Sequence, residues 1–105
     1  SAESPRECVA LVHGCLANNS VMWLLARRLR QRGYRTRVWG YWNHRCSLLV
    51  HADRFAKELE SLDADPLLER IHLVGHSMGG IIGQAALDRY RPEKLGRLVM
   101  LGSPS

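Results

Sequence analysis

The sequence has little cysteine and no long apolar run, and these gaps exclude several classes of protein. Its three cysteines, Cys8, Cys15 and Cys46, are an odd number without Cys-x-x-Cys spacing, which predicts neither a zinc site nor a disulfide framework. A reducing, cytoplasmic compartment is the default expectation. No apolar stretch approaches the roughly 20 residues that a membrane-spanning helix needs. Residues 1–7 are polar and do not resemble the apolar core of a signal peptide.

The charge of the chain is one-sided, because its formal net charge is +5 and six arginines lie between positions 27 and 37. Such a cluster is typical of a surface for nucleic acid or anionic membranes. It is also typical of a solvated helix face with charged strand ends. Aromatic residues do not alternate with the arginines as a stacking platform would require. We therefore favour the solvated face and expect no nucleic-acid partner.

Apolar patterns predict four strands alternating with three helices in one domain of 105 residues. The strands are expected at 8–13, 35–42, 71–75 and 97–102, and the helices at about 20–32, about 50–62 and from the turn after 75 to about Tyr90. Gly33 is expected to end the first helix. Alternating Arg35 and Arg37 predict that the second strand lies at a sheet edge. Strands separated by helices indicate a parallel sheet with right-handed crossovers.

Packing residues follow from the same patterns. The first helix is expected to bury one face, and Leu67 and Leu68 to pack in the turn before the third strand. The residues expected on the buried face of the first helix are Val21, Leu24, Leu25 and Leu29. Cys8 is expected to begin a buried strand.

One motif carries the chemistry of the chain, Gly75-His76-Ser77-Met78-Gly79-Gly80. It follows an apolar strand and leads into a helix, which is the context of a Gly-x-Ser-x-Gly nucleophile elbow. The tight turn strains the backbone at the serine, so Gly75 and Gly79 are needed to leave room. The hydroxyl of Ser77 is then exposed at a helix N-terminus that favours a developing anion. The alternative is a glycine-rich turn without chemistry.

Together with Val12-His13-Gly14 at the end of an earlier strand, this motif resembles the α/β-hydrolase fold in its bacterial lipase and esterase branch. The resemblance implies an α/β fold with three layers, a four-stranded parallel sheet of order 2-1-3-4 and three crossover helices. It covers only the central core of that fold, so we expect a single minimal or truncated domain over residues 1–105. Ser77 and the loop after His13 would then face a topological switch point, where ligands bind.

The resemblance also implies roles for the residues of the motif. Ser77 would be the nucleophile, and the backbone N–H groups of Met78 and Cys15 would form the oxyanion hole. His76 would flank the serine with its ring directed away. Cys15 as a thiol nucleophile is the less favoured alternative, since no nearby group would stabilise a thiolate. No metal or cofactor is expected.

The catalytic base is not fixed by the sequence. The family places an acid and then a histidine after the serine, but no histidine follows Ser77, and the acidic residues there, Asp88 and Glu93, are expected away from the site. The candidates are His44, in the loop after the second strand and with Asp53 as its possible partner, and His13. A third option is that no dedicated base exists. His51 and His72 are expected to be structural.

The expected function is hydrolysis of carboxylic esters, with short acyl chains favoured because no lid is present. An apolar acyl site could be lined by Leu16, Trp23, Trp39, Trp42 and Met78, each of which could equally be core. The alternative is a non-catalytic fragment or binding module. One helix on one face cannot cover four strands, so the fourth strand would be a bare apolar edge. We expect it, or the half-covered face, to form a homo-oligomer.

Overall fold

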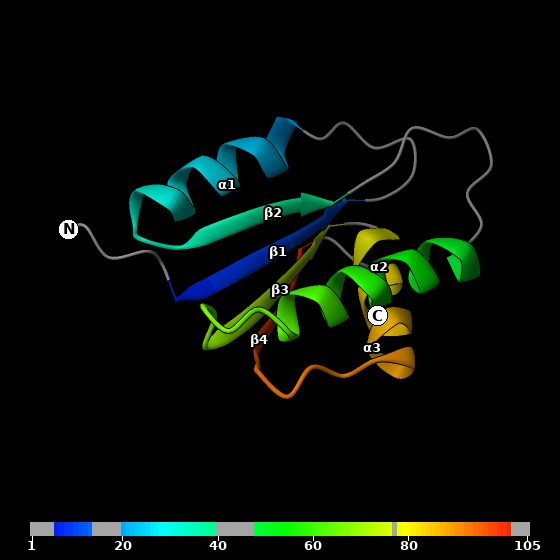
Figure 1. The fold of residues 1–105 in the computed structure, drawn as a ribbon. Coiled ribbons are helices and arrows are strands. Elements are labelled where there is room, and N and C mark those ends of the chain that lie inside the picture. Colours follow the sequence, from blue (N-terminus) through cyan, green and yellow to red (C-terminus); the bar gives the residue numbers. More distant parts are fainter. Residues whose placement is uncertain (1–5, 14–19, 40–47, 77, 102–105) are drawn as a thin grey trace.

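The chain forms one parallel sheet with helices on both faces. The computed structural model describes residues 6–13, 20–39, 48–76 and 78–101. Its elements alternate as the sequence predicts (Figure 1). Their bounds are β1 Glu7–His13, α1 Ser20–Gln31, β2 Arg35–Trp39, α2 Leu48–Asp63, β3 Arg70–His76, α3 Met78–Arg89 and β4 Leu95–Leu101. Residues 40–42 and 102, which were expected to extend two of the strands, lie outside the described residues.

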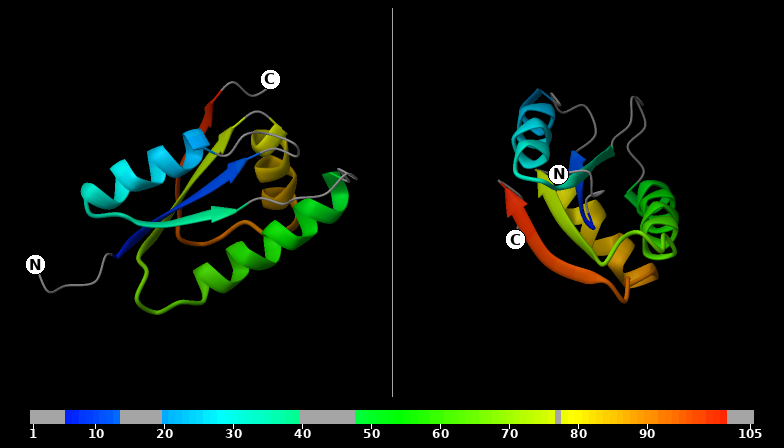
Figure 2. Two further views of the ribbon diagram at one scale, coloured as in Figure 1. Left: turned by 90° about the horizontal axis from the view of Figure 1, so that it is seen from above. Right: turned by 60° about the vertical axis from the view of Figure 1, so that its left-hand side comes forward.

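The order of the strands is β2-β1-β3-β4, and every neighbouring pair is parallel. This confirms the predicted order and the predicted edge position of β2. Figure 2 shows α1 on one face of the sheet and α2 with α3 on the other. The connections after β1 and β3 therefore leave toward opposite faces, as the predicted topology requires.

The two faces of the sheet bury unequal cores. Beneath α2 and α3, a cluster of thirteen buried residues includes Phe55, Leu59 and Leu73. Beneath α1, the buried cluster is smaller among the described residues and consists of Val9, Leu11, Met22, Ala26 and Val74. The second face is half-covered because a single helix cannot span four strands.

Gly33 ends α1 in the manner that the sequence predicts. Its φ of 93° lies in the left-handed region that glycine adopts without strain. The Gly33 N–H donates to the Arg30 carbonyl, and the Tyr34 N–H donates to the Leu29 carbonyl. This pair of bonds is a Schellman motif, which turns the chain directly into β2.

Two of the packing predictions are wrong. Leu24 is 56% exposed and Leu67 is 64% exposed. The buried side of α1 is formed instead by Met22 and Ala26, with Leu25 and Leu29 partly buried, so Leu24 falls on the outer side of the helix. In the turn before β3, Leu68 alone enters the core.

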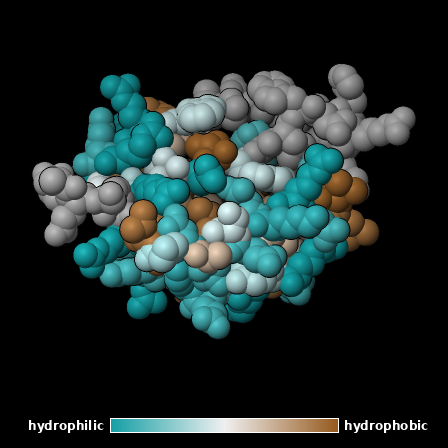
Figure 3. All heavy atoms as spheres, viewed as in Figure 1, coloured by the Kyte–Doolittle hydropathy of each residue, from teal (hydrophilic) through white to brown (hydrophobic). Residues whose placement is uncertain are grey.

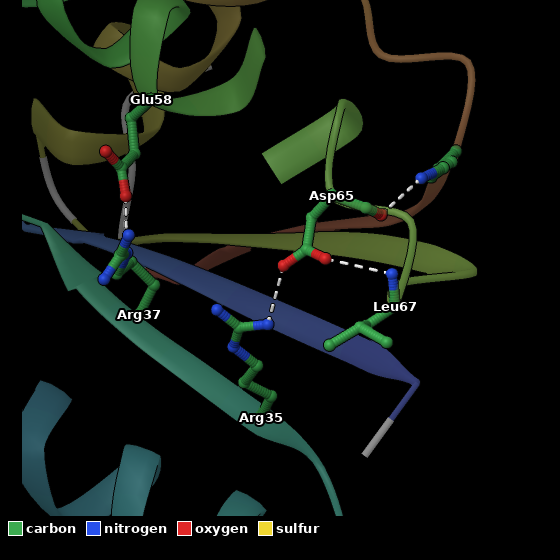
Figure 4. A network of polar contacts seen from close by, with 6 residues as sticks. Arg35, Arg37, Glu58, Asp65 and Leu67 are labelled. Carbon is green, nitrogen blue, oxygen red and sulfur yellow. Dashed lines mark hydrogen bonds and ion pairs between the residues drawn. The ribbon is translucent and has the colours of Figure 1, made fainter. Parts of the chain in front are cut away.

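The two edges of the sheet differ in character. On β2, the guanidinium of Arg35 donates to Asp65 at 2.9 Å and that of Arg37 to Glu58 at 2.5 Å (Figure 4). On β4, by contrast, Leu98, Val99 and Leu101 remain 37–41% exposed. A groove of about 340 Å³ separates β4 from the end of α1. The fourth strand is thus an apolar edge, as the sequence predicts.

Candidate active site

The junction of β3 and α3 is as tight as an elbow requires. β3 ends at His76 and α3 begins at Met78, so a single position separates strand from helix. A Cβ atom on Gly75 would lie 2.5 Å from the Cα of Gly80 and 2.8 Å from its nitrogen. No side chain fits between these backbones, which explains the glycine at position 75. Ser77 itself lies outside the described residues.

Gly79 brings the first turn of α3 against the end of β1. A Cβ atom at this position would lie 2.6 Å from the Val12 carbonyl carbon, nearer still to the Val12 oxygen, and 3.0 Å from the His13 carbonyl carbon. Both partners are backbone atoms and cannot rotate away. The N-terminus of α3 is therefore held beside the point at which the loop after His13 begins.

Backbone register brings the two motif segments together. His13 and His76, the last residues of β1 and β3, are direct partners in the parallel ladder. The residues that follow them therefore start from neighbouring positions at the C-terminal end of the sheet. Because the two connections leave on opposite faces, this position is the topological switch point of the sheet. The positive end of the α3 dipole lies at the same place.

Two histidines lie at this position. His13 is buried, with 5% of its surface exposed. His76 is half-buried, and its Nδ1 is buried without a hydrogen bond to any of the described residues. Cys15 and His44, the other predicted site residues, lie outside the described ranges, as do Leu16 and Trp42. The structure does not describe the side chain of Met78.

The remaining histidines have structural surroundings, in line with expectation. The Nδ1 atom of His72 accepts the Arg97 N–H at 2.9 Å, so Nε2 carries the proton and donates to Glu7 Oε1 at 2.7 Å. Gly96 leaves room for this ring, because its own Cβ would lie 2.5 Å from Cε1. His51 is buried and contacts Trp39 edge-on, with ring centroids 6.2 Å apart.

The acidic residues that follow position 77 lie away from the site. Asp88 is exposed near the end of α3, and Glu93 is exposed in the turn beyond it. Asp53, suggested as a partner for His44, accepts from Arg89 Nε at 2.6 Å, and His44 itself lies outside the described residues. No acid that could orient a histidine is therefore found at the strand ends within the described part of the chain.

Two of the tryptophans suggested for an acyl site lie within the described residues. Trp23 is 53% exposed on α1. Trp39 is half-buried against Phe55, with ring centroids 5.2 Å apart, and packs against the larger core cluster. Cys8 is fully buried in β1, and burial raises the pKa of its thiol, so it is an inert packing residue.

A polar cluster at the opposite end of the sheet was not predicted. The Asp63 carboxylate accepts the Tyr90 hydroxyl and the backbone N–H groups of Glu93 and Lys94. The Lys94 ammonium donates to the Asp65 carbonyl at 2.8 Å. These residues lie 27 to 31 positions apart, so no local pattern could have identified their contacts.

The described residues contain no group of three or more His, Cys, Asp or Glu side chains that could hold a metal ion. None of the helices in that part of the chain combines the length and the apolar character needed to cross a membrane.

Known proteins resemble this chain in both sequence and structure. Residues 9–105 match the family model described as alpha/beta hydrolase fold. A Mycoplasma pneumoniae protein named as an esterase/lipase is 28% identical over 102 residues, which cover 91% of this chain and 36% of that protein. The chain thus spans little more than a third of this relative.

Two solved structures share the fold. The mature form of a Bacillus licheniformis lipase superposes with a TM-score of 0.76 at 21% identity, covering 99% of this chain and 42% of the lipase. An extracellular α/β-hydrolase of a Paenibacillus species gives a TM-score of 0.70 at 22% identity, covering 93% of this chain and 41% of that protein. At such identities the likeness establishes the fold alone.

Proposed function

The chain belongs to the alpha/beta hydrolase fold family, and we propose that it hydrolyses carboxylic esters through an acyl-enzyme on Ser77. The observation that carries this proposal is the single-residue junction between β3 and α3, closed by Gly75 and Gly79. A connection this short restricts the backbone, and exposing a nucleophile is the known role of such a turn between a strand and a helix. The esterase/lipase name of the Mycoplasma relative supports the same reaction class.

In the proposed reaction, Ser77 Oγ attacks the ester carbonyl carbon. The backbone N–H groups of Met78 and Cys15 donate to the oxyanion, aided by the positive end of the α3 dipole. Collapse of the tetrahedral intermediate breaks the bond to the alcohol oxygen, which takes up the proton lost by Ser77. Water then attacks the acyl-enzyme, releasing the acid and restoring the hydroxyl.

The base is His44 or His13 in this proposal, with a reaction that has no dedicated base as the third option. His13 is supported by its position at the end of β1, beside the first turn of α3. Oxyanion donors and binding alone leave catalysis roughly 10³–10⁴-fold above water. A slow esterase is therefore physically reasonable even without a triad. Short acyl chains are the proposed substrates.

A non-catalytic binding module is the second candidate. It is favoured by one observation, that Asp88 and Glu93, the acids that follow position 77 within the described residues, are exposed away from the strand ends. Such a module would retain the fold and the elbow without turnover.

The deciding experiment measures hydrolysis of a short-chain p-nitrophenyl ester and labelling by a fluorophosphonate. The esterase proposal requires both to disappear in Ser77→Ala, with the fold retained by circular dichroism. Ser61→Ala, an exposed serine on α2, is the matched control. Equal rates of ester hydrolysis in wild type and Ser77→Ala would contradict the esterase proposal and support the binding module. His13→Ala and His44→Ala then identify the base by their loss of turnover, or show that neither serves.

We also propose that the chain self-associates through β4. The support is the exposed Leu98, Val99 and Leu101 on an edge strand, since apolar edges recruit further strands. Sedimentation should give a species heavier than 11.9 kDa, and Val99→Lys should return it to the monomer. A wild-type protein that remains monomeric at micromolar concentration would contradict this.

A further inference from the structure

The outer side of α1 is unusual for a solvated helix, because its first turn exposes two large apolar side chains. Trp23 is 53% exposed and Leu24 is 56% exposed, whereas Met22 and Ala26 on the inner side are fully buried. Docking α1 with Met22 and Ala26 toward the sheet therefore leaves the tryptophan and leucine facing out. Neither side chain belongs to a core cluster.

Two arginines lie on the same outer side of α1, one turn further along the helix. Arg27 and Arg28 follow Trp23 and Leu24 by four residues, so each lies one turn along the helix from an apolar partner. Figure 3 shows hydrophilic side chains over the C-terminal half of α1. The helix sequence SVMWLLARRLRQ contains no acidic residue.

These arginines differ from those of β2 because the β2 arginines are paired with carboxylates. Arg35 and Arg37 are paired with Asp65 and Glu58. Within the described residues, no carboxylate pairs with Arg27 or Arg28, and both are exposed. Favourable contact with the helix C-terminus explains basic residues there, but it does not explain the exposed Trp23 and Leu24.

We propose that the outer side of α1 docks on an anionic phospholipid surface, with Trp23 and Leu24 entering the interface and Arg27 and Arg28 contacting lipid phosphates. Tryptophan and leucine beside arginine on one helix face are the composition of an interfacial helix. The negative surface potential of an anionic leaflet attracts each arginine that lies near it. Nucleic acid is the weaker candidate, because Leu24 gains nothing from phosphates and, among the described residues, no second exposed aromatic side chain on α1 accompanies Trp23.

This docking does not depend on the proposed function, because it uses no residue of the candidate active site. It has a geometric consequence for that site nonetheless. α1 begins at the C-terminal end of the sheet, the end at which β1 and β3 finish (Figure 1). A surface bound at Trp23 would therefore lie on the same side of the molecule as the strand ends.

The test is vesicle co-sedimentation, with phosphatidylcholine alone and with phosphatidylcholine containing phosphatidylserine. The wild-type chain should bind the anionic vesicles, and added salt should release it. Arg27→Gln with Arg28→Gln should weaken that binding at least about tenfold. Trp23→Ser with Leu24→Ser should weaken it similarly and abolish the blue shift of tryptophan fluorescence on binding.

A matched control separates the α1 surface from net charge. Arg54→Gln with Lys57→Gln removes the same charge from exposed positions on α2. This control should bind as wild type does. Equal losses in the control and in the α1 variants, or no binding by the wild type, would overturn the proposal. Binding to duplex DNA that survives Trp23→Ser with Leu24→Ser would overturn it too and identify a nucleic-acid surface instead.

Discussion

The two ends of the sheet are held together by different means. At the N-terminal end, where the strands begin, side chains make the ties, including Arg35 to Asp65, His72 to Glu7 and Tyr90 to Asp63. At the C-terminal end, where β1 and β3 finish, two close contacts join backbones, Gly79 against the Val12 carbonyl and Gly75 against Gly80. Side chains also meet there, since Trp39 at the end of β2 packs against His51 and Phe55. Among the described residues, the feature that distinguishes the C-terminal end is the pair of backbone contacts that leave no room for a Cβ atom.

This difference predicts how each end responds to substitution. A side-chain tie can be removed singly, at the cost of the hydrogen bonds it made. A backbone contact cannot be relieved by a change of rotamer, so any added atom displaces α3 from β1 and disturbs the candidate site with it. We therefore expect single substitutions to destabilise the fold more at the C-terminal end than at the N-terminal end.

The largest effect is expected for Gly79→Ala. The added methyl group would overlap the Val12 carbonyl, so we expect a loss of at least about 3 kcal/mol in the free energy of unfolding, or failure to fold. Gly83→Ala is the matched control in the same helix, because its Cβ would meet nothing within 4 Å. It should gain about 0.5–1 kcal/mol from helix propensity. Urea denaturation measures both, and a Gly79→Ala protein as stable as wild type would refute the contrast.

At the N-terminal end, the largest effect is expected for Asp63→Ala. Its removal leaves the Tyr90 hydroxyl and two backbone N–H groups without their acceptor. The expected cost is about 1–3 kcal/mol. Asp88→Ala, which removes an exposed aspartate of α3, should cost under about 0.5 kcal/mol. The same denaturation series compares them, and equal losses would show that the Asp63 ties carry no stability.

Acid should weaken the N-terminal end selectively. Partial burial acts to raise the pKa of Asp63, but hydrogen bonds from Tyr90 and two backbone groups outweigh it, so that pKa lies below its ordinary value of 3.8. The Leu67 N–H and then Arg35 lower the pKa of Asp65. Carboxylates with lowered pKa values stabilise the fold above their ordinary pKa. That stability is lost as the pH falls through the folded values.

The measurement is the free energy of unfolding as the pH falls from about 5 to about 2. Asp63→Asn should show a shallower acid loss than wild type, whereas Asp88→Asn should match wild type. Parallel curves for all three proteins would show that Asp63 does not contribute to acid sensitivity.

The smallest effect is a spectroscopic one. The hydrogen bond to Asp63 raises the pKa of Tyr90 from 10.0 to about 12. A raised pKa stabilises the fold below the ordinary value, and this contribution is lost as the pH rises through about 12. In an ultraviolet titration, one of the three tyrosines should ionise late. Tyr90→Phe should remove that late step, and a wild-type titration without it would contradict the prediction.

Much of the fold could be predicted because short apolar runs, helical spacing of apolar residues and glycine positions are local signals. The strands, the helices and the strand order follow from them and from the family resemblance. The prediction that Leu24 is buried was wrong because Met22 and Leu24 are both apolar. Only the way in which α1 packs on the sheet decides which of the two is buried. The Asp63 contacts could not be foreseen, since they join residues that only the fold brings together.

For the candidate site, the structure describes the residues that flank position 77 but not the predicted catalytic groups. Gly75 and Gly79 have the close contacts that the motif implies. Asp53 pairs with Arg89, a contact between two helices that proximity in sequence could not indicate. The roles of Ser77, Cys15 and His44 remain predictions for the experiments above.

The contact of Gly79 with Val12 also bears on how this family can diversify. Because backbone atoms hold the strand end and the helix together, the half-buried side chain at position 76 is not required to keep the two in place. A library of variants should therefore tolerate many residues at position 76 and lose every variant at 75 and 79. Selection could then alter the residue before the serine, and with it substrate choice, without changing the turn itself.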